Sequence, residues 1–338
     1  MLGTVALLAG AALPGTAAAA VYCAHNSGEF KAALNAAGGN GVSDTIRLTR
    51  TEMNTNGSPF HAVVDVGESL IIEGGWQDAF GPCAMLTNDA SRTVLNGNGL
   101  SHVLAIQGSS GTGSIKVRNL TIRGGYRFDP ALWGAGLYIV GTQLGDISVE
   151  RVRFIDNVSN SVGAGLHVSG GGDVSVLNSV FFGNVSGLNA AAMHIYSNQN
   201  IYVTNNTVSG NFASLPGLAA AASFLAPSTY LSNNIFYANT DPGQSDVFAD
   251  SSVALVRNDI EILTGSPSVL SNGNTSVDPS FIGGGDLRLQ DDSPLVDLGT
   301  NAAFGGVGTL DIAGSPRING IIDLGAYESA PLMSDGFE

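Results

Sequence analysis

The chain has very few basic residues. Only 13 of its 338 residues are Lys or Arg, against 28 Asp and Glu, and the only lysines are Lys31 and Lys116. The resulting net charge of −15 argues against nucleic acid as a partner, because neutralising phosphates requires a basic face. We therefore expect no nucleic-acid partner.

Cysteine is equally scarce, since Cys23 and Cys83 are the only two. No C-x-x-C pair or Cys/His spacing typical of zinc occurs, and we expect no metal site. Neither cysteine has a neighbouring base that would activate a thiolate, which favours a structural role over a catalytic one. In an oxidising compartment the two would form a disulfide that staples the N-terminal part of the chain.

Charged residues are absent from the first 20 positions, which contain an apolar run and then an alanine tract. This pattern predicts a secretory signal peptide cleaved after Ala20, although the basic start of such peptides is missing. An uncleaved membrane anchor is the alternative. Cleavage would leave a secreted or cell-surface protein with no stable membrane span in the mature chain.

Glycine, by contrast, is abundant, with 46 residues, and a strand repeat runs through the middle of the chain. Its copies end in asparagines spaced 27, 27 and 28 residues apart, namely Asn157, Asn184, Asn211 and Asn239. Inside each copy, apolar and polar residues alternate as in a strand. A fixed period of several short strands predicts a parallel β-helix, with these asparagines forming a ladder at a tight bend, where they tolerate unusual backbone angles.

Helical spacing appears only near the start of the predicted mature chain. Ser27 is the expected N-cap, Gly38 follows the expected end, and the apolar residues between them are Phe30, Ala33, Leu34 and Ala37. Such a helix would cover the open edge of the first coil. We divide the chain into a signal peptide (1–20), an N-terminal cap (21–44), a β-helix (45–260), terminal rungs with a C-terminal cap (261–330) and a short tail (331–338).

The C-terminal third contains three distinctive segments: DPSF at 278–281, GGGDLRLQDDSPLVDLG at 283–299 and DIAGSPRINGIIDLGAYE at 311–328. With the repeat, they resemble secreted bacterial right-handed parallel β-helix proteins of the pectate-lyase-like group that carry a choice-of-anchor Q type terminal segment. The resemblance implies a right-handed, all-β solenoid that is exported or displayed on a bacterial surface. We expect an extracellular polysaccharide or a surface protein as partner.

An insertion interrupts the repeat, because the step from Gly125 to Asn157 is 32 residues where later steps are 27. Its aromatic side chains lead into strands whose outward residues should stack in one column. Together they suit the apolar faces and hydroxyls of a sugar chain. The candidate ligand-binding residues are Tyr126, Arg127, Phe128, Trp133, Tyr138, His167 and His194. Alternatively, the aromatics form a small satellite core and the two histidines are ordinary surface residues.

Asp146 and Asp173 are the best carboxylate pair for catalysis, since they precede equivalent strands 27 residues apart. Stacked about 5 Å apart, they would match a retaining glycosidase. Turn capping explains them as well, because Ser114 and Asn200 occupy the same position on adjoining rungs.

Six basic residues cluster on adjoining rungs and would suit an anionic sugar: Lys116, Arg118, Arg123, Arg127, Arg151 and Arg153. In a lyase, Arg118 or Arg153 would abstract the proton and calcium would be the cofactor. Alternatively, Arg151 and Arg153 pair with Glu150 and Asp156 on an exposed face.

We rank a non-enzymatic adhesion or glycan-binding solenoid first, and a polysaccharide lyase or glycoside hydrolase second.

Overall fold

A computed structural model describes residues 19–129, 131, 133–141, 144–215, 219–240, 246–265 and 268–329. Residues 1–18 of the predicted signal peptide and the predicted tail lie outside these ranges. Within them, no helix is long and apolar enough to cross a membrane.

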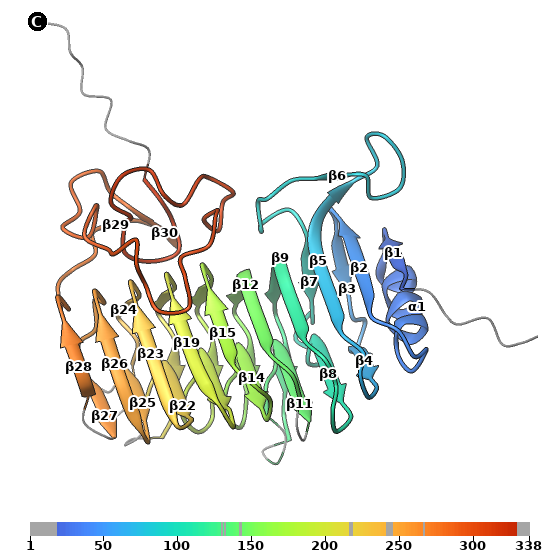
Figure 1. Cartoon of the computed structure of the whole chain (residues 1–338), viewed down its shortest axis with the longest axis horizontal. Helices are drawn as coiled ribbons and strands as arrows, with labels where there is room; N and C mark the ends of the chain where they lie inside the picture. The colour runs from blue at the N-terminus through green and yellow to red at the C-terminus, as the bar shows by residue number, and fades with distance from the viewer. Residues whose placement is uncertain are drawn as a thin grey trace, which may run out of the picture.

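The chain forms a coil of parallel strands, which confirms the predicted all-β parallel β-helix (Figure 1). Sheet A follows the order β1 (Val21–Ala24), β2 (Asp44–Thr49), β5 (Leu70–Gln77), β9 (Ile115–Arg123), β12 (Ile147–Ile155), β15 (Val174–Leu177), β19 (Asn200–Thr204), β23 (Ser228–Ser232), β26 (Ser252–Val256) and β28 (Ser268–Asn272). Sheet B contains β4 (Phe60–Val64), β8 (Leu104–Gly108), β11 (Leu137–Gly141), β14 (Leu166–Ser169), β18 (Met193–Tyr196), β22 (Ala222–Leu225), β25 (Val247–Ala249) and β27 (Leu263–Gly265).

Shorter strands complete each rung. Beyond a bend, sheet A continues in β3 (Glu52–Asn54), β7 (Val94–Asn96), β16 (Val180–Phe182), β20 (Thr207–Ser209) and β24 (Ile235–Tyr237). A small third sheet contains β10 (Tyr126–Arg127), β13 (Val158–Ser159), β17 (Val185–Ser186) and β21 (Phe212–Ala213). The apolar residues that alternate along sheet A face inward, so that Val117, Val149, Val176 and Val203 stack in register and are fully buried.

The repeated asparagines make a continuous ladder. The side-chain amides of Asn157, Asn184 and Asn211 each donate to the Oδ1 of the next ladder residue at 2.9 Å, ending at Asn239. However, their expected left-handed backbone belongs to the residue before each of them, and these residues are Asp156, Gly183, Gly210 and Ala238. The ladder asparagines therefore supply hydrogen bonds, while their predecessors turn the chain.

A second column, which we call the bend column, marks the turn in sheet A. Its residues all have φ between 50° and 59°, and they are Asn119, Arg151, Asn178, Asn205, Asn233 and Arg257. Asparagine adopts this left-handed region more readily than most residues, whereas arginine does not share that preference. The bend column thus contains two unusual members.

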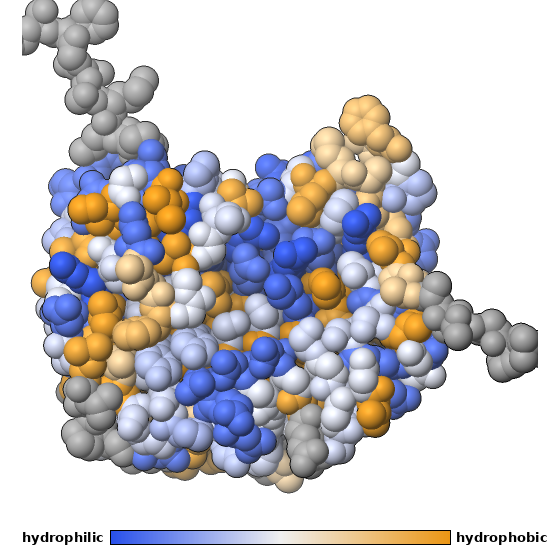
Figure 2. Space-filling view, viewed as in Figure 1, coloured by the Kyte–Doolittle hydropathy of each residue, from blue (hydrophilic) through white to orange (hydrophobic). Residues whose placement is uncertain are grey.

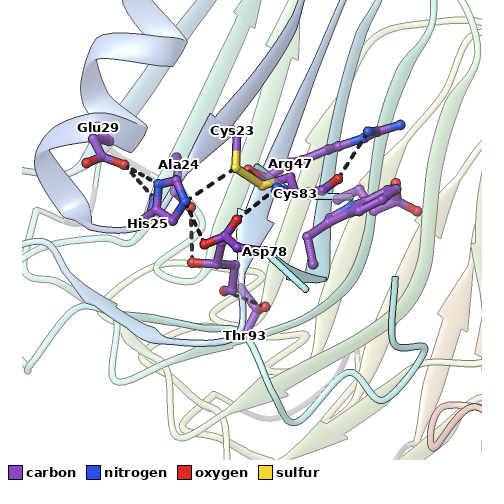
Figure 3. Close-up of a disulfide and its surroundings, with 11 residues drawn as sticks. Cys23, Ala24, His25, Glu29, Arg47, Asp78, Cys83 and Thr93 are labelled. Atoms are coloured by element: carbon purple, nitrogen blue, oxygen red, sulfur yellow. Dashed lines mark hydrogen bonds and ion pairs between the residues drawn. A yellow bond between two sulfur atoms is a disulfide. The ribbon is translucent and has the colours of Figure 1, made fainter. Parts of the chain in front are cut away.

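The N-terminal cap is one helix, α1 (Ser27–Ala37), with the four predicted apolar residues buried. The N-cap is Asn26 rather than Ser27, because the Asn26 side chain accepts from the amides of Gly28 and Glu29. The predicted disulfide is confirmed, as Cys23 on β1 is bonded to Cys83 with the Cα atoms 5.7 Å apart (Figure 3). It ties the cap to a hairpin formed by β5 and β6 (Met85–Leu86).

The C-terminal cap, formed by residues 278–329, folds back over sheet A (Figure 1). It contains the hairpin of β29 (Phe281–Gly283) and β30 (Asp286–Leu289). Arg317, from the third distinctive segment, is fully buried and donates to the carbonyls of Asp323 and Gly325 at 2.8 Å. The bend column holds this cap, since Asn178 and Asn205 donate to the carbonyl of Val307 and Asn233 donates to that of Thr300.

Candidate functional site

The outer face of sheet B has a column of stacked rings. Tyr138, His167 and His194 are aligned in register on β11, β14 and β18. The Tyr138 and His167 ring centroids lie 5.5 Å apart with 19° between the planes, and those of His167 and His194 lie 5.1 Å apart with 11°. Parallel strands in register therefore produce a ribbon of aromatic and imidazole faces.

The inserted loop lies against this column. The Trp133 ring is 4.9 Å from that of His167, and Arg127 donates to the carbonyls of Trp133 and Gly134. Trp133 nevertheless remains 40% exposed, and Phe128, in the same loop, is 70% exposed. Tyr126 is half-buried on β10. The loop combines a packed base with two exposed aromatic rings.

One expectation about this column was wrong. His167 points outward from the sheet but is only 1% exposed, so it is not a surface residue. Trp133 covers its ring, and Gly134 approaches so closely that an added Cβ would lie 3.0 Å from the His167 Cβ. Sequence alternation correctly indicates the outward direction but cannot show what covers it.

Burial keeps the two histidines neutral. It lowers the pKa of His194 to about 4, and the pKa of His167 falls well below its usual range through burial and then the charges of His194 and Arg127. Their Nδ1 atoms lie 3.2 Å apart, a distance at which one ring donates to the other. Among the described residues, the buried Nε2 of His167 has no hydrogen-bond partner. Neutral imidazoles suit a ligand that is rich in hydroxyl groups.

Two further histidines, His61 and His102, adjoin this face and were not predicted from the sequence. His61 on β4 occupies the same column, two strands before Tyr138, and its Nε2 is 3.2 Å from Oε1 of Gln107. Burial lowers the pKa of His102 to about 4, followed by the charges of Arg127 and His61. The β5–β6 hairpin lies between β4 and β8 in the chain and breaks the 27-residue period, so spacing alone does not align these two strands. For His61 the outward position on β4 is the only available signal, and His102, which precedes β8, offers no such signal.

The contacts of Asp146 and Asp173 are those of turn capping. Oδ1 of Asp146 accepts from the amide of Asp173 at 3.1 Å. Oδ1 of Asp173 in turn accepts from the backbone and side-chain amides of Asn200, both at 3.0 Å. Each carboxylate thus binds the following rung.

Arg118 and Arg153 lie away from these carboxylates. Asp146 directly precedes β12, whereas Arg153 lies within this strand, beyond the bend at Arg151. Nε of Arg118 is 2.8 Å from Oε1 of the buried Glu73, and Arg123 pairs with Glu52. The structure does not bring the four candidate catalytic residues into one constellation.

The expected surface pairing of Arg151 and Arg153 was also wrong. Arg151 is only 4% exposed, and within the described residues neither arginine forms an ion pair with Glu150 or Asp156. Arg151 lies at the left-handed bend of sheet A, with φ 52°, and is buried there instead of lying on an exposed strand face.

One group of three potential metal-ligand side chains occurs among the described residues: Cys23, His25 and Asp78. Cys23 is bonded to Cys83, so it cannot offer a thiolate (Figure 3). His25 instead lies between two carboxylates, 2.7 Å from Glu29 and 3.0 Å from Asp78. The Glu29 hydrogen bond is the main cause that raises the pKa of His25.

No family model matches the chain, and a search of curated proteins finds no significant match. The assignment of a role therefore depends on the geometry of the faces described above.

Proposed function

We propose that this protein is an exported, non-enzymatic β-helix that binds an extracellular glycan on the outer face of sheet B. The observation that carries the proposal is the register-stacked column of Tyr138, His167 and His194 beside the exposed rings of Trp133 and Phe128. The resemblance to bacterial pectate-lyase-like solenoids with a choice-of-anchor Q type segment supports an extracellular location.

The chemistry of this face favours neutral sugars. Exposed aromatic rings provide apolar surfaces on which sugar rings stack, and neutral imidazole and tyrosine groups hydrogen-bond hydroxyls. Arg127 lies with its guanidinium carbon 5.1 Å from the Tyr138 ring centre and donates to loop carbonyls. Its positive charge is therefore already used to hold the loop in place.

A glycan array of the mature protein tests this proposal. Replacing Phe128 and Trp133 with alanine should weaken retention of the bound glycan at least tenfold, because both exposed rings are lost. Phe80→Ala is the matched control, since Phe80 is 89% exposed on the distant β5–β6 hairpin. Equal retention by the double variant and the control would overturn the role of sheet B.

The same bound glycan should remain intact during incubation with calcium. Products that absorb in the ultraviolet would reveal a lyase, and new reducing ends without this absorbance would reveal a hydrolase. Either result would overturn the non-enzymatic part of the proposal while leaving the binding face in place.

A further inference from the structure

A notch opens on the sheet A side of the molecule, over β9 and β12. Figure 2 shows hydrophilic surface between two projections, the β5–β6 hairpin and the C-terminal cap. The segment that follows β6 meets the cap, because the amide of Ala90 donates to the carbonyl of Ile312 at 3.3 Å and Gly314 packs against Asn88. The notch is therefore walled by segments from both ends of the chain.

The bend column bonds to the segments on both sides of the notch. On one side, Asn119 donates to the carbonyls of Gly74 and Thr87 and so holds the hairpin segment. On the other side, Asn178 and Asn205 hold the cap through Val307. Arg151 lies between Asn119 and Asn178 in this column, at the gap between the tethered walls.

Arg151 lacks the partners that its neighbours have. Arg151 is only 4% exposed, yet its Nε has no hydrogen-bond partner among the described residues, and the buried Nε of Arg153 also lacks one. A buried guanidinium nitrogen without a partner is costly, because its lost hydration is not replaced. Such a group calls for an acceptor that the described residues do not supply.

Two of the nearby acids, Glu73 and Asp311, already have partners. Four residues alternate in sign across adjacent rungs, and they are Arg47, Glu73, Arg118 and Glu150. Within this row, Glu73 already contacts Arg118 and accepts from the Trp76 indole at 3.1 Å. On the cap, Asp311 accepts from the amides of Ala313, Ser315 and Glu328. The charge of Glu150 also acts on Arg151, but no described carboxylate forms an ion pair with the Arg151 guanidinium.

We propose that this notch is a binding site for a single oxyanion, with Arg151 as the principal ligand and Arg118 and Arg153 beside it. Guanidinium groups bind sulfate, phosphate and carboxylate oxygens through paired, charge-assisted hydrogen bonds. The walls at both ends of the notch block a long polymer lying along the coil axis. The ligand is therefore a small acid or one acidic group of a saccharide, on a different face from the proposed glycan site.

Calorimetric titration at constant ionic strength tests the site with three probes: inorganic sulfate, inorganic phosphate and galacturonate. We expect saturable binding of at least one probe, and the preferred probe distinguishes a tetrahedral anion from a carboxylate. Arg151→Asn should weaken the binding of that probe at least tenfold. The variant should keep the fold, because asparagine occupies the neighbouring positions of the same bend. Arg257→Asn is the matched control, as it makes the same change at φ 56° outside the notch.

Arg153→Gln provides a second variant, independent of the bend, and should also weaken binding. Absence of saturable binding by all three probes would overturn the proposal. Equal loss in the Arg151→Asn and Arg257→Asn variants would also overturn it, since the effect would then follow from general charge. Glycan retention should be unchanged in Arg151→Asn, which separates this site from the sheet B face.

Discussion

At the scale of single residues, the buried histidines link the sheet B face to acidity. An exposed histidine in the unfolded chain has a pKa near 6.5, whereas burial lowers that of His194 to about 4 in the folded protein. The folded state thus binds fewer protons between these values. The resulting stability is fully present above pH 6.5 and is lost as the pH falls through 4.

We predict that His194→Gln removes the part of this acid dependence that comes from His194, while the contributions of His167 and His102 remain. The wild-type free energy of unfolding should lose roughly 3 kcal/mol from this site between pH 6.5 and 4, at about 1.4 kcal/mol per pKa unit. Urea denaturation at a series of pH values measures it. His25→Gln is the control, because the pKa of His25 is raised and its contribution is lost in the opposite direction, with rising pH. An unchanged acid slope in His194→Gln would contradict the assignment.

Residue patterns also show what the sequence can and cannot predict. The predicted outward column of Tyr138, His167 and His194 is aligned correctly, since these residues are in register on neighbouring strands. The same spacing cannot show that Trp133 covers His167, because loop packing is not periodic. It also misplaces the left-handed residues, which precede the ladder asparagines, because asparagine favours turns as readily as the aspartate and glycine found at three of these positions.

At the scale of elements, the disulfide joins two pieces of the chain that lie on different rungs. Cys23 belongs to β1 and Cys83 to the β5–β6 hairpin, and the bond closes a separation of 60 residues. Closing such a loop restricts the unfolded chain more than the folded one. The same hairpin forms one wall of the notch.

Replacing Cys23 and Cys83 with alanine should therefore lower the free energy of unfolding by about 2–4 kcal/mol. Thermal denaturation of the double variant, compared with the wild type with and without reductant, measures this loss. Reductant should leave the variant unchanged. A variant as stable as the oxidised wild type would show that the hairpin and cap hold together without the bond.

The bend column makes a separate prediction for the C-terminal cap. Asn205→Ala removes a 3.0 Å hydrogen bond to Val307 and a 2.9 Å bond from Asn233, which should cost about 1–3 kcal/mol. The variant should accelerate amide hydrogen exchange more in the cap than in the coil. Asn119→Ala is the control, since Asn119 tethers the hairpin segment instead. Equal acceleration of cap exchange in both variants would refute a specific tether.

At the scale of the whole molecule, the sequence predicts the coil much better than the surface around it. The coil follows from alternation and a constant period, both of which are local. The notch depends on a cap that folds back over rungs far earlier in the chain, and no local pattern contains that information. Asn178 and Val307, for example, are bonded across 129 residues.

This back-folding has a consequence for the order of events during biosynthesis. The cap is made last, yet the groups that it contacts, from Asn178 to Asn233, are made much earlier. Contacts between such distant residues form slowly, because the chain between them must first be ordered. The proposed oxyanion notch is therefore completed only after the C-terminal segment docks, so a chain whose C-terminal segment is not yet folded has its coil without its cap.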